Sequence, residues 1–200
     1  MTSRNLARLT ALLGPPPPDV VPVPWEEAPA EIGFQFPADY RELIDTYGWI
    51  SLNDEFWIGG PTEEPSSLPG VPTRFEDFVR ATTRDGLLRQ FDNEHAAGNI
   101  QGAPYPVLPT PGGLLRWGGQ DVDNCFWLTE GPDPDTWPIV VLHGDLEEWI
   151  RFEGGVVEFL IAVCTQQYEY WDELLLAPLG ELTGRPYELR GDWSGSRSLD

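Results

Sequence analysis

The sequence predicts a single α+β domain in which a mostly antiparallel, twisted sheet follows a pair of helices and carries a further helix packed on it. Three patterns predict this fold: an apolar stripe at helical spacing in the first quarter of the chain, a series of short strand-like runs separated by turn residues, and an apolar helical run after them. Strands grouped together, with helices before and after, are typical of α+β folds and not of alternating α/β folds. With 200 residues, the chain is long enough to bury one sizeable core.

Residues 1–21 are expected to form an N-terminal helix and a proline-rich spacer. A helix over residues 5–13 would carry its leucines on one face, namely Leu6, Leu9, Leu12 and Leu13. Gly14 and four consecutive prolines follow, and such a run favours an extended polyproline conformation. We therefore expect the spacer to separate this helix from the main domain, which is expected over residues 22–177.

The strongest helix signal lies between Pro37 and Gly48. Pro37 suits the first position of a helix, where its missing N–H costs nothing, and Asp39 places a negative charge at the positive end of the helix dipole. Gly48 supplies a left-handed stop, as Gly33 does for a shorter helix upstream. One apolar stripe joins positions i, i+3, i+4 and i+7, namely Tyr40, Leu43, Ile44 and Tyr47.

This arrangement resembles the opening motif of the SUKH superfamily, which includes yeast cell-wall-synthesis regulators and many bacterial immunity proteins that neutralise polymorphic toxins. The residues that carry the resemblance are Gly33, Phe36, Pro37, Asp39, Tyr40, Leu43, Ile44, Tyr47 and Gly48. The later order of strands and a closing helix extends the resemblance over residues 22–165. The resemblance implies an α+β domain that acts by binding, and in particular an immunity protein that occludes a toxin inside the producing or a sibling cell.

Two short strands are predicted directly after this motif, at residues 50–52 and 56–58, with Asn53 and Asp54 in the turn between them. Residues 59–72 are rich in Gly, Pro and Ser and indicate a loop. A helical pattern then begins at Phe75 and continues towards Phe91, with a break at Gly86.

The second half of the chain is predicted to be an antiparallel meander closed by helices. Turn residues separate four strand-like runs, at residues 114–118, 124–129, 138–142 and 147–152. Residues 154–165 predict a strongly apolar helix that packs on the inner face of the sheet, and residues 168–176 predict one more. Residues 178–200 are polar and are expected to form a loosely held tail.

The net charge limits the kinds of partner that the chain can bind. The chain carries 33 acidic and 12 basic residues and no lysine, for a net charge of −21. Such a field repels nucleic acid and anionic lipid and attracts cationic partners. We therefore expect a basic protein partner, with no nucleic-acid or membrane partner, although a high net charge also serves solubility alone. No apolar run has the length of a membrane span or a signal sequence, which predicts a cytoplasmic protein.

Motifs for catalysis, metals or cofactors are not found in the sequence. His95 and His143 have no cysteines at zinc-ligand spacing, and neither a phosphate-binding loop nor a nucleophile elbow occurs. Cys125 and Cys164 are expected to be buried free thiols. Paired carboxylates are the one enzymatic feature left, and with 33 acids such pairs arise by chance. We therefore expect no enzyme activity, no cofactor and no metal.

An acid-rich stretch between Gly119 and Glu153 is the candidate partner-binding surface. Its only opposing base is Arg151, and most of its acids fall in predicted turns and strand edges, where they are expected to be exposed together. Tryptophans among them could supply the rigid apolar anchors that binding hot spots favour. An ordinary solvated sheet rim has the same composition, so that alternative stays open. The residues of the predicted site are Asp121, Asp123, Trp127, Glu130, Asp133, Asp135, Trp137, Glu147 and Glu148.

These observations favour a non-catalytic binding protein, of the immunity type that the resemblance implies. A housekeeping regulatory or scaffold module is the second interpretation, since the resemblance has a eukaryotic branch. A glycan-binding protein or hydrolase is the third, because aromatic residues near acids, such as Trp127 with Glu130, could line a sugar groove. The sequence does not predict the oligomeric state.

Overall fold

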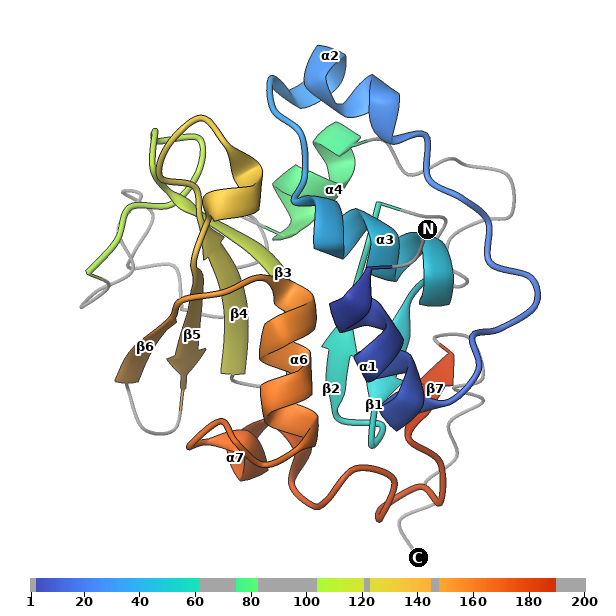
Figure 1. The fold of residues 1–200 in the computed structure, drawn as a ribbon. Coiled ribbons are helices and arrows are strands. Elements are labelled where there is room, and N and C mark those ends of the chain that lie inside the picture. The colour runs from blue at the N-terminus through green and yellow to red at the C-terminus, as the bar shows by residue number, and fades with distance from the viewer. Residues whose placement is uncertain (1–2, 62–74, 83–103, 121–122, 145–147, 190–200) are drawn as a thin grey trace, which may run out of the picture.

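A seven-stranded sheet forms the centre of the molecule (Figure 1). In this computed structural model, which describes residues 3–61, 75–82, 104–120, 123–144 and 148–189, the strands follow the order β6-β5-β4-β3-β2-β1-β7 and every neighbouring pair is antiparallel. The strands are β1 (Ile50–Leu52), β2 (Phe56–Ile58), β3 (Leu114–Gln120), β4 (Asp123–Leu128), β5 (Ile139–His143), β6 (Glu148–Phe152) and β7 (Tyr187–Leu189). Strands β3 to β6 are neighbours in sequence and in space, which confirms the predicted meander and the α+β class.

Helices cover one face of this sheet. Helix α6 (Val156–Cys164) lies across it, with α1 (Arg4–Leu13) and α3 (Ala38–Tyr47) alongside (Figure 1). The 3-10 turn η1 (Trp25–Glu27), α2 (Ala28–Ile32) and α4 (Phe75–Thr82) pack together beyond α3, and the 3-10 turn η3 (Pro134–Thr136) connects β4 to β5. Helix α7 (Trp171–Leu175) follows α6. The predicted helix from Phe75 is confirmed up to Thr82, and its predicted continuation lies outside the described residues.

Helix α3 has the boundaries that its sequence predicts, apart from a start at Ala38 with Pro37 as the capping residue. All four residues of its apolar stripe are fully buried. Gly33 and Gly48 end α2 and α3 with φ of 82° and 68°, a backbone region that glycine adopts without strain. The Tyr47 hydroxyl, at the end of the stripe, donates to the carbonyl oxygen of Gly14 at 2.7 Å. The stripe therefore joins α3 both to the core and to the N-terminal segment.

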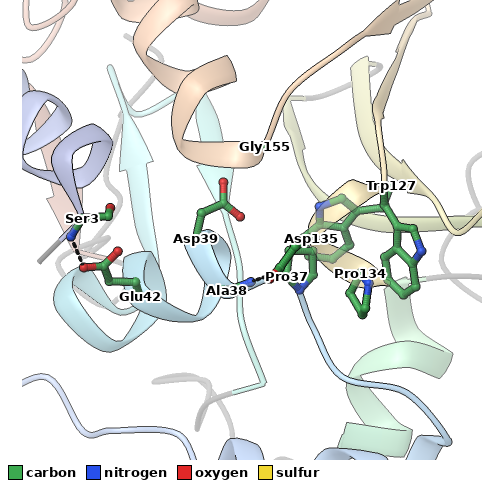
Figure 2. A pocket seen from close by; sticks show the side chains of 10 residues that line it. Ser3, Pro37, Ala38, Asp39, Glu42, Trp127, Pro134, Asp135 and Gly155 are labelled. Atoms are coloured by element: carbon green, nitrogen blue, oxygen red, sulfur yellow. Dashed lines mark hydrogen bonds between the residues drawn. The ribbon is translucent and has the colours of Figure 1, made fainter. Parts of the chain in front are cut away.

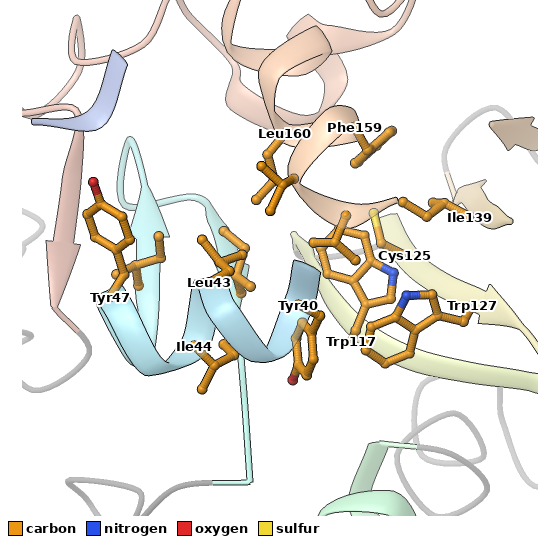
Figure 3. Packing of buried hydrophobic residues seen from close by; sticks show 14 of the residues in the cluster. Tyr40, Leu43, Ile44, Tyr47, Trp117, Cys125, Trp127, Ile139, Phe159 and Leu160 are labelled. Carbon is orange, nitrogen blue, oxygen red and sulfur yellow. The ribbon is translucent and has the colours of Figure 1, made fainter. Parts of the chain in front are cut away.

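The main core is aromatic and lies between the sheet and helices α3 and α6 (Figure 3). Trp127 meets Tyr40 edge-on, with ring centroids 4.7 Å apart, and Trp117 meets Phe159 in the same way at 5.9 Å. Each such side chain contributes about 1.5–3 kcal/mol by its removal from water. Cys125 is buried here as a free thiol, and burial raises its pKa well above the usual value. Cys164 is also free, as predicted, and is partly buried.

The N-terminal helix is not set apart from the domain, which corrects the expectation drawn from the proline run. Leu6 and Leu9 are fully buried, Leu13 is 2% exposed, and α1 packs against both α6 and α3. The proline-rich segment that follows runs around the outside of the fold before the chain enters α2 (Figure 1). Burial of the leucine stripe holds α1 in place, because the same stripe exposed to water would lose that stabilisation.

The described part of the segment after Pro178, up to Leu189, is also held by the domain, contrary to the expected loose tail, and residues 190–200 of that prediction lie outside the described residues. Strand β7 pairs with β1 in the register Leu52 to Tyr187, and thereby forms an edge of the sheet. The Tyr187 hydroxyl donates to the carbonyl oxygen of Pro15 at 2.7 Å. This part of the chain is held by backbone hydrogen bonds between β7 and β1, and such long-range pairing produces no local pattern in the sequence.

The opposite face of the sheet carries a second, smaller apolar cluster. It consists of Leu114, Phe126, Leu128, Val140 and Leu142, with Tyr105, Val107 and Trp149 packed against it. Every residue of β4 and of β5 is consequently buried, whichever face it points to. In the described ranges, no helix combines the length and apolarity that a membrane span requires.

Candidate functional site: an acid-lined pocket at three helix ends

A pocket of about 360 Å³ opens where α1, α3 and α6 begin (Figure 2). Ser3 precedes α1, Ala38 begins α3 and Gly155 precedes α6, and all of them line the pocket. Turn η3 closes one side with Pro134 and Asp135. Three segments that lie far apart in the sequence thus form one concave site.

Each of the three helix starts meets a carboxylate from another element. The backbone N–H of Ser3 donates to Glu42 at 2.6 Å, and that of Ala38 donates to Asp135 at 2.6 Å (Figure 2). The N–H of Val157, in the first turn of α6, donates to Asp39 at 3.0 Å. Because the first N–H groups of a helix have no partner within the helix, these carboxylates act as capping groups supplied by neighbours. The pocket is therefore fixed by side chains that belong to its own wall.

Asp39 is the most constrained of the three acids. Its Oδ1 accepts from the N–H of Tyr40 at 2.7 Å within α3, while its Oδ2 accepts from Val157 in α6. Burial raises the pKa of Asp39, and the nearby Asp135 carboxylate raises it further, whereas the backbone hydrogen bonds act in the opposite direction. A side chain at Gly155 would collide with the Asp39 carboxylate, so only glycine lets α6 approach α3 this closely.

The charge of the pocket remains negative after the helix dipoles are counted. A helix N-terminus is equivalent to about half a positive charge, so three of them offset roughly one and a half of the three carboxylate charges. No arginine is among the described residues that line the pocket. A cation, and not an anion, is the ligand that this environment favours, despite the three helix N-termini.

Trp127 and Trp137 supply the apolar part of the pocket wall. Trp127 is fully buried, and Trp137 is 6% exposed. The Trp137 indole N–H donates to the carbonyl oxygen of Gly131 at 3.1 Å, and its ring meets Phe34 edge-on at 5.7 Å. Both rings are therefore rigid, and they position η3 and its acids against the start of α3.

Part of the site predicted from the sequence falls in this pocket. Trp127, Asp135 and Trp137 line it, and Asp133 is the adjacent exposed acid, whose Oδ1 accepts from the N–H of Asp135 at 3.1 Å. The expectation that Trp127 is a surface anchor is corrected, however, because both faces of β4 are covered and its ring belongs to the core. Trp137 is likewise buried and supports the acids instead of protruding.

The other predicted residues do not join the pocket. Glu130 is exposed and forms an ion pair with Arg151 at 2.6 Å. Glu148 lies opposite His143 in the β5–β6 register, which is the end of β5 farther from η3. The length of β5, about 13 Å at roughly 3.3 Å per residue, therefore separates Glu148 from η3. Asp121 and Glu147 lie outside the described residues. The predicted acid-rich surface is thus divided between two ends of the meander.

Asp123 was expected at an exposed edge, and the structure corrects this: its side chain is buried. It accepts from the N–H of Gly144 at 2.8 Å, and its other oxygen lies 3.4 Å from His143 Nδ1. His143 Nε2 lies 2.8 Å from the Tyr168 hydroxyl. These three side chains form a closed, buried network between the sheet and the segment after α6, which explains the position of His143 without a ligand. Among the described residues, no group of His, Cys, Asp and Glu side chains could hold a metal ion.

Two acids of the pocket, Asp39 and Glu42, were not predicted as site residues. The sequence indicates Asp39 only as a charge at the start of its own helix, and its contact with α6 joins residues 118 apart in the chain. Glu42 lies one turn further along α3 and meets Ser3 only because α1 returns to the body of the domain. The one local signal was their spacing, since residues three apart in a helix share a face.

The fold and the pocket together define an α+β protein with a helix-covered antiparallel meander and a rigid acidic recess. No family model, no curated protein and no solved structure matches the chain.

Proposed function

We propose that this protein is a non-catalytic binding protein that neutralises a basic toxin domain by occluding it, in the manner of an immunity protein. The observation that carries the proposal is the acid-lined pocket, where Asp39, Glu42 and Asp135 leave a net negative charge inside a preformed concave site. The resemblance of residues 33–48 to the SUKH opening motif supports the same class of function. The overall charge of −21 adds long-range attraction for a cationic partner.

The pocket suits one basic side chain from the partner. Its volume of about 360 Å³ lies near the lower end of the range of roughly 300–1,000 Å³ that is common for ligand sites. An arginine or lysine that enters it would meet three carboxylates whose positions are already fixed by the helix caps. Preorganised acceptors of this kind reduce the entropy lost on binding. Asp133, which caps η3, and Asp135, within η3, are both exposed and would meet further basic groups at the rim.

The same pocket gives no specific support to the sugar-binding alternative. Sugar recognition by tryptophan needs an accessible ring face, and the rings of Trp127 and Trp137 are buried. The carboxylates of Asp39 and Asp135 already cap helices, so each keeps a structural partner. These observations favour protein binding over the glycan alternative.

The experiment is capture of partners from the lysate and secreted fraction of the source organism, at low and high salt. The bait is the full chain, compared with a variant that combines Glu42→Gln, Asp133→Asn and Asp135→Asn. These amides retain an oxygen for the helix caps while removing three charges. A single basic protein retained by the wild type, and bound at least about tenfold more weakly by the variant, is the expected result.

A matched control removes three charges elsewhere, by Glu169→Gln, Asp172→Asn and Glu181→Gln, all exposed positions after α6. This control should keep the affinity within a few-fold of the wild type. The captured protein should also arrest growth when expressed alone, and co-expression of the present chain should restore growth. Equal loss of affinity in both variants would make the pocket irrelevant, and a partner that is harmless to cells would refute the immunity role.

A further inference from the structure

The face of the sheet opposite α6 holds an arginine on a tryptophan pair. The guanidinium carbon of Arg116 lies 4.5 Å from the ring centroid of Trp57, within the range of a cation–π contact. Trp57 is in turn nearly parallel to Trp49, with an interplanar angle of 10° and centroids 6.5 Å apart. Phe56 and Ile58 belong to the main core, so the alternation along β2 directs Trp57 away from it.

Two glycines make room for these side chains on the sheet. A Cβ atom at Gly119 would collide with the carbonyl oxygen of Asp123 and stand 3.1 Å from Nη2 of Arg116, and one at Gly59 would stand 3.0 Å from the ring of Trp49. All three approaches are tighter than ordinary contacts. At Gly119 the neighbouring backbone already excludes a side chain, and at Gly59 a side chain would press on the tryptophan ring, so the sheet surface leaves room for this group.

Within the part of the chain that the structure describes, the guanidinium of Arg116 has no anionic partner. Its Nε is buried and makes no hydrogen bond, and among the residues that the structure describes no carboxylate pairs with it. Arg151, by contrast, pairs with both Glu130 and Glu153. Burial lowers the pKa of Arg116 to about 10, so the side chain is still a cation at neutral pH. A buried donor without a partner is costly, and this one occurs in a chain with 33 acids.

We propose that Arg116, held on the ring of Trp57, is a binding site for a carboxylate group. A guanidinium stacked on an aromatic ring keeps its in-plane N–H donors available, and their fork matches the two oxygens of a carboxylate. The net charge of −21 repels polyanions such as nucleic acids. A single carboxylate carries only one negative charge, yet its two oxygens can accept from both N–H donors of the guanidinium fork. The site faces away from the acid-lined pocket and does not depend on the proposed function.

The test follows the indole N–H resonances of the full, ¹⁵N-labelled protein, with those of Trp57 and Trp49 assigned by Trp57→Phe and Trp49→Phe. Sodium acetate represents a free carboxylate, and N-acetylglutamate amide represents a protein side chain. Sodium chloride is the reference for an anion without a carboxylate, and N-acetylglutamine amide is the neutral reference for the glutamate derivative. We expect a saturable shift of the Trp57 resonance with at least one carboxylate and none with the references. Saturation by acetate alone assigns the site to small carboxylates, and tighter binding of the glutamate derivative assigns it to a partner's side chain.

Arg116→Gln should weaken this binding at least about tenfold, and Arg116→Lys should weaken it less, because the charge persists without the planar fork. Arg151→Gln is the matched control: it removes one arginine charge that is already paired, and it should leave the titration unchanged. A shift that is linear, equal with chloride, or unchanged in Arg116→Gln would overturn the proposal. The fold of each variant is checked by its remaining indole resonances, so loss of structure is not mistaken for loss of binding.

Discussion

Gly155 determines whether α3 and α6 can share one carboxylate. A Cβ atom there would overlap Oδ2 of Asp39, the oxygen that accepts from Val157. We expect Gly155→Ala to lower the free energy of unfolding by about 1–3 kcal/mol, the usual cost of forced overpacking. Urea denaturation measures it. In an Asp39→Ala background the obstructing group is gone, so the same substitution should cost less, and equal costs in both backgrounds would show that the two residues do not interact.

Asp39 also makes the free energy of unfolding depend on pH. Its folded-state pKa lies above the ordinary value of 3.8, mainly because of burial, so the folded protein binds a proton more readily than the unfolded chain does. The contribution of Asp39 to stability is therefore greatest below that ordinary value and falls as pH rises through the folded-state pKa. We expect the stability difference between the wild type and Asp39→Asn to shift in favour of the variant as pH is raised from 3.8. Urea melts across this pH range check it, and a difference that is constant or moves the other way contradicts it.

At the scale of elements, Asn53 holds the C-terminal segment against the β1–β2 turn. The two N–H donors of its Nδ2 are shared among the carbonyl oxygens of Leu175, Ala177 and Pro178 at 2.9–3.2 Å, and its Oδ1 accepts from the N–H of Gly180 at 2.6 Å. We expect Asn53→Gly, which suits its φ of 55°, to cost about 2–4 kcal/mol at roughly 1 kcal/mol per bond. Denaturant melts measure the cost, and amide exchange should show loss of protection in β7.

Asp54 offers a matched control for this prediction, because it is the next residue and also has a positive φ, of 62°. Asp54→Gly should change stability by less than about 1 kcal/mol, since glycine tolerates this backbone conformation and only a turn residue is altered. If both variants lose the same stability, the turn conformation and not the amide of Asn53 holds the segment.

Elements with a complete local pattern could be predicted from the sequence. Helix α3, strands β1 and β2, the meander and α6 each have a periodicity and a stop signal within a few residues, and the structure confirms them. The docking of α1 and the pairing of β7 could not be predicted, because the first depends on which surface covers a leucine stripe and the second on backbone hydrogen bonds to β1. Polar composition over residues 178–189 does not indicate a strand, because a three-residue edge strand needs few apolar side chains.

The candidate site was predictable to a smaller extent, for the same reason. Asp135 could be named because η3 is a turn with local Asp and Pro signals, whereas Asp39 and Glu42 become part of the pocket only when three helix starts meet. Trp127 was expected at the surface because strands with one wet face alternate, and β4 does not alternate: the second apolar cluster covers its other face. Local composition therefore identifies the acids of a turn, but it does not show which faces of the sheet are covered by other parts of the chain.

At the scale of the whole molecule, the net charge of −21 acts on stability and on binding with opposite signs. Like charges on a compact chain repel each other, and salt screens them, with a Debye length that falls from about 30 Å at 0.01 M to about 10 Å at 0.1 M. We therefore expect added NaCl to raise the free energy of unfolding by at least about 1 kcal/mol, or roughly 2–4 °C in Tm for a chain of this size. Captured basic partners should bind more weakly over the same range.

Thermal melts in NaCl and KCl at equal ionic strength separate screening from specific ion effects, because screening depends on ionic strength alone. The two salts should give the same rise in Tm. The variant that neutralises Glu169, Asp172 and Glu181 should start at a higher Tm in low salt and gain less from added salt, since it has fewer charges to screen. A Tm that is flat or falls with ionic strength would mean that the acids are already balanced locally, and the net charge would then supply no long-range attraction for a basic partner.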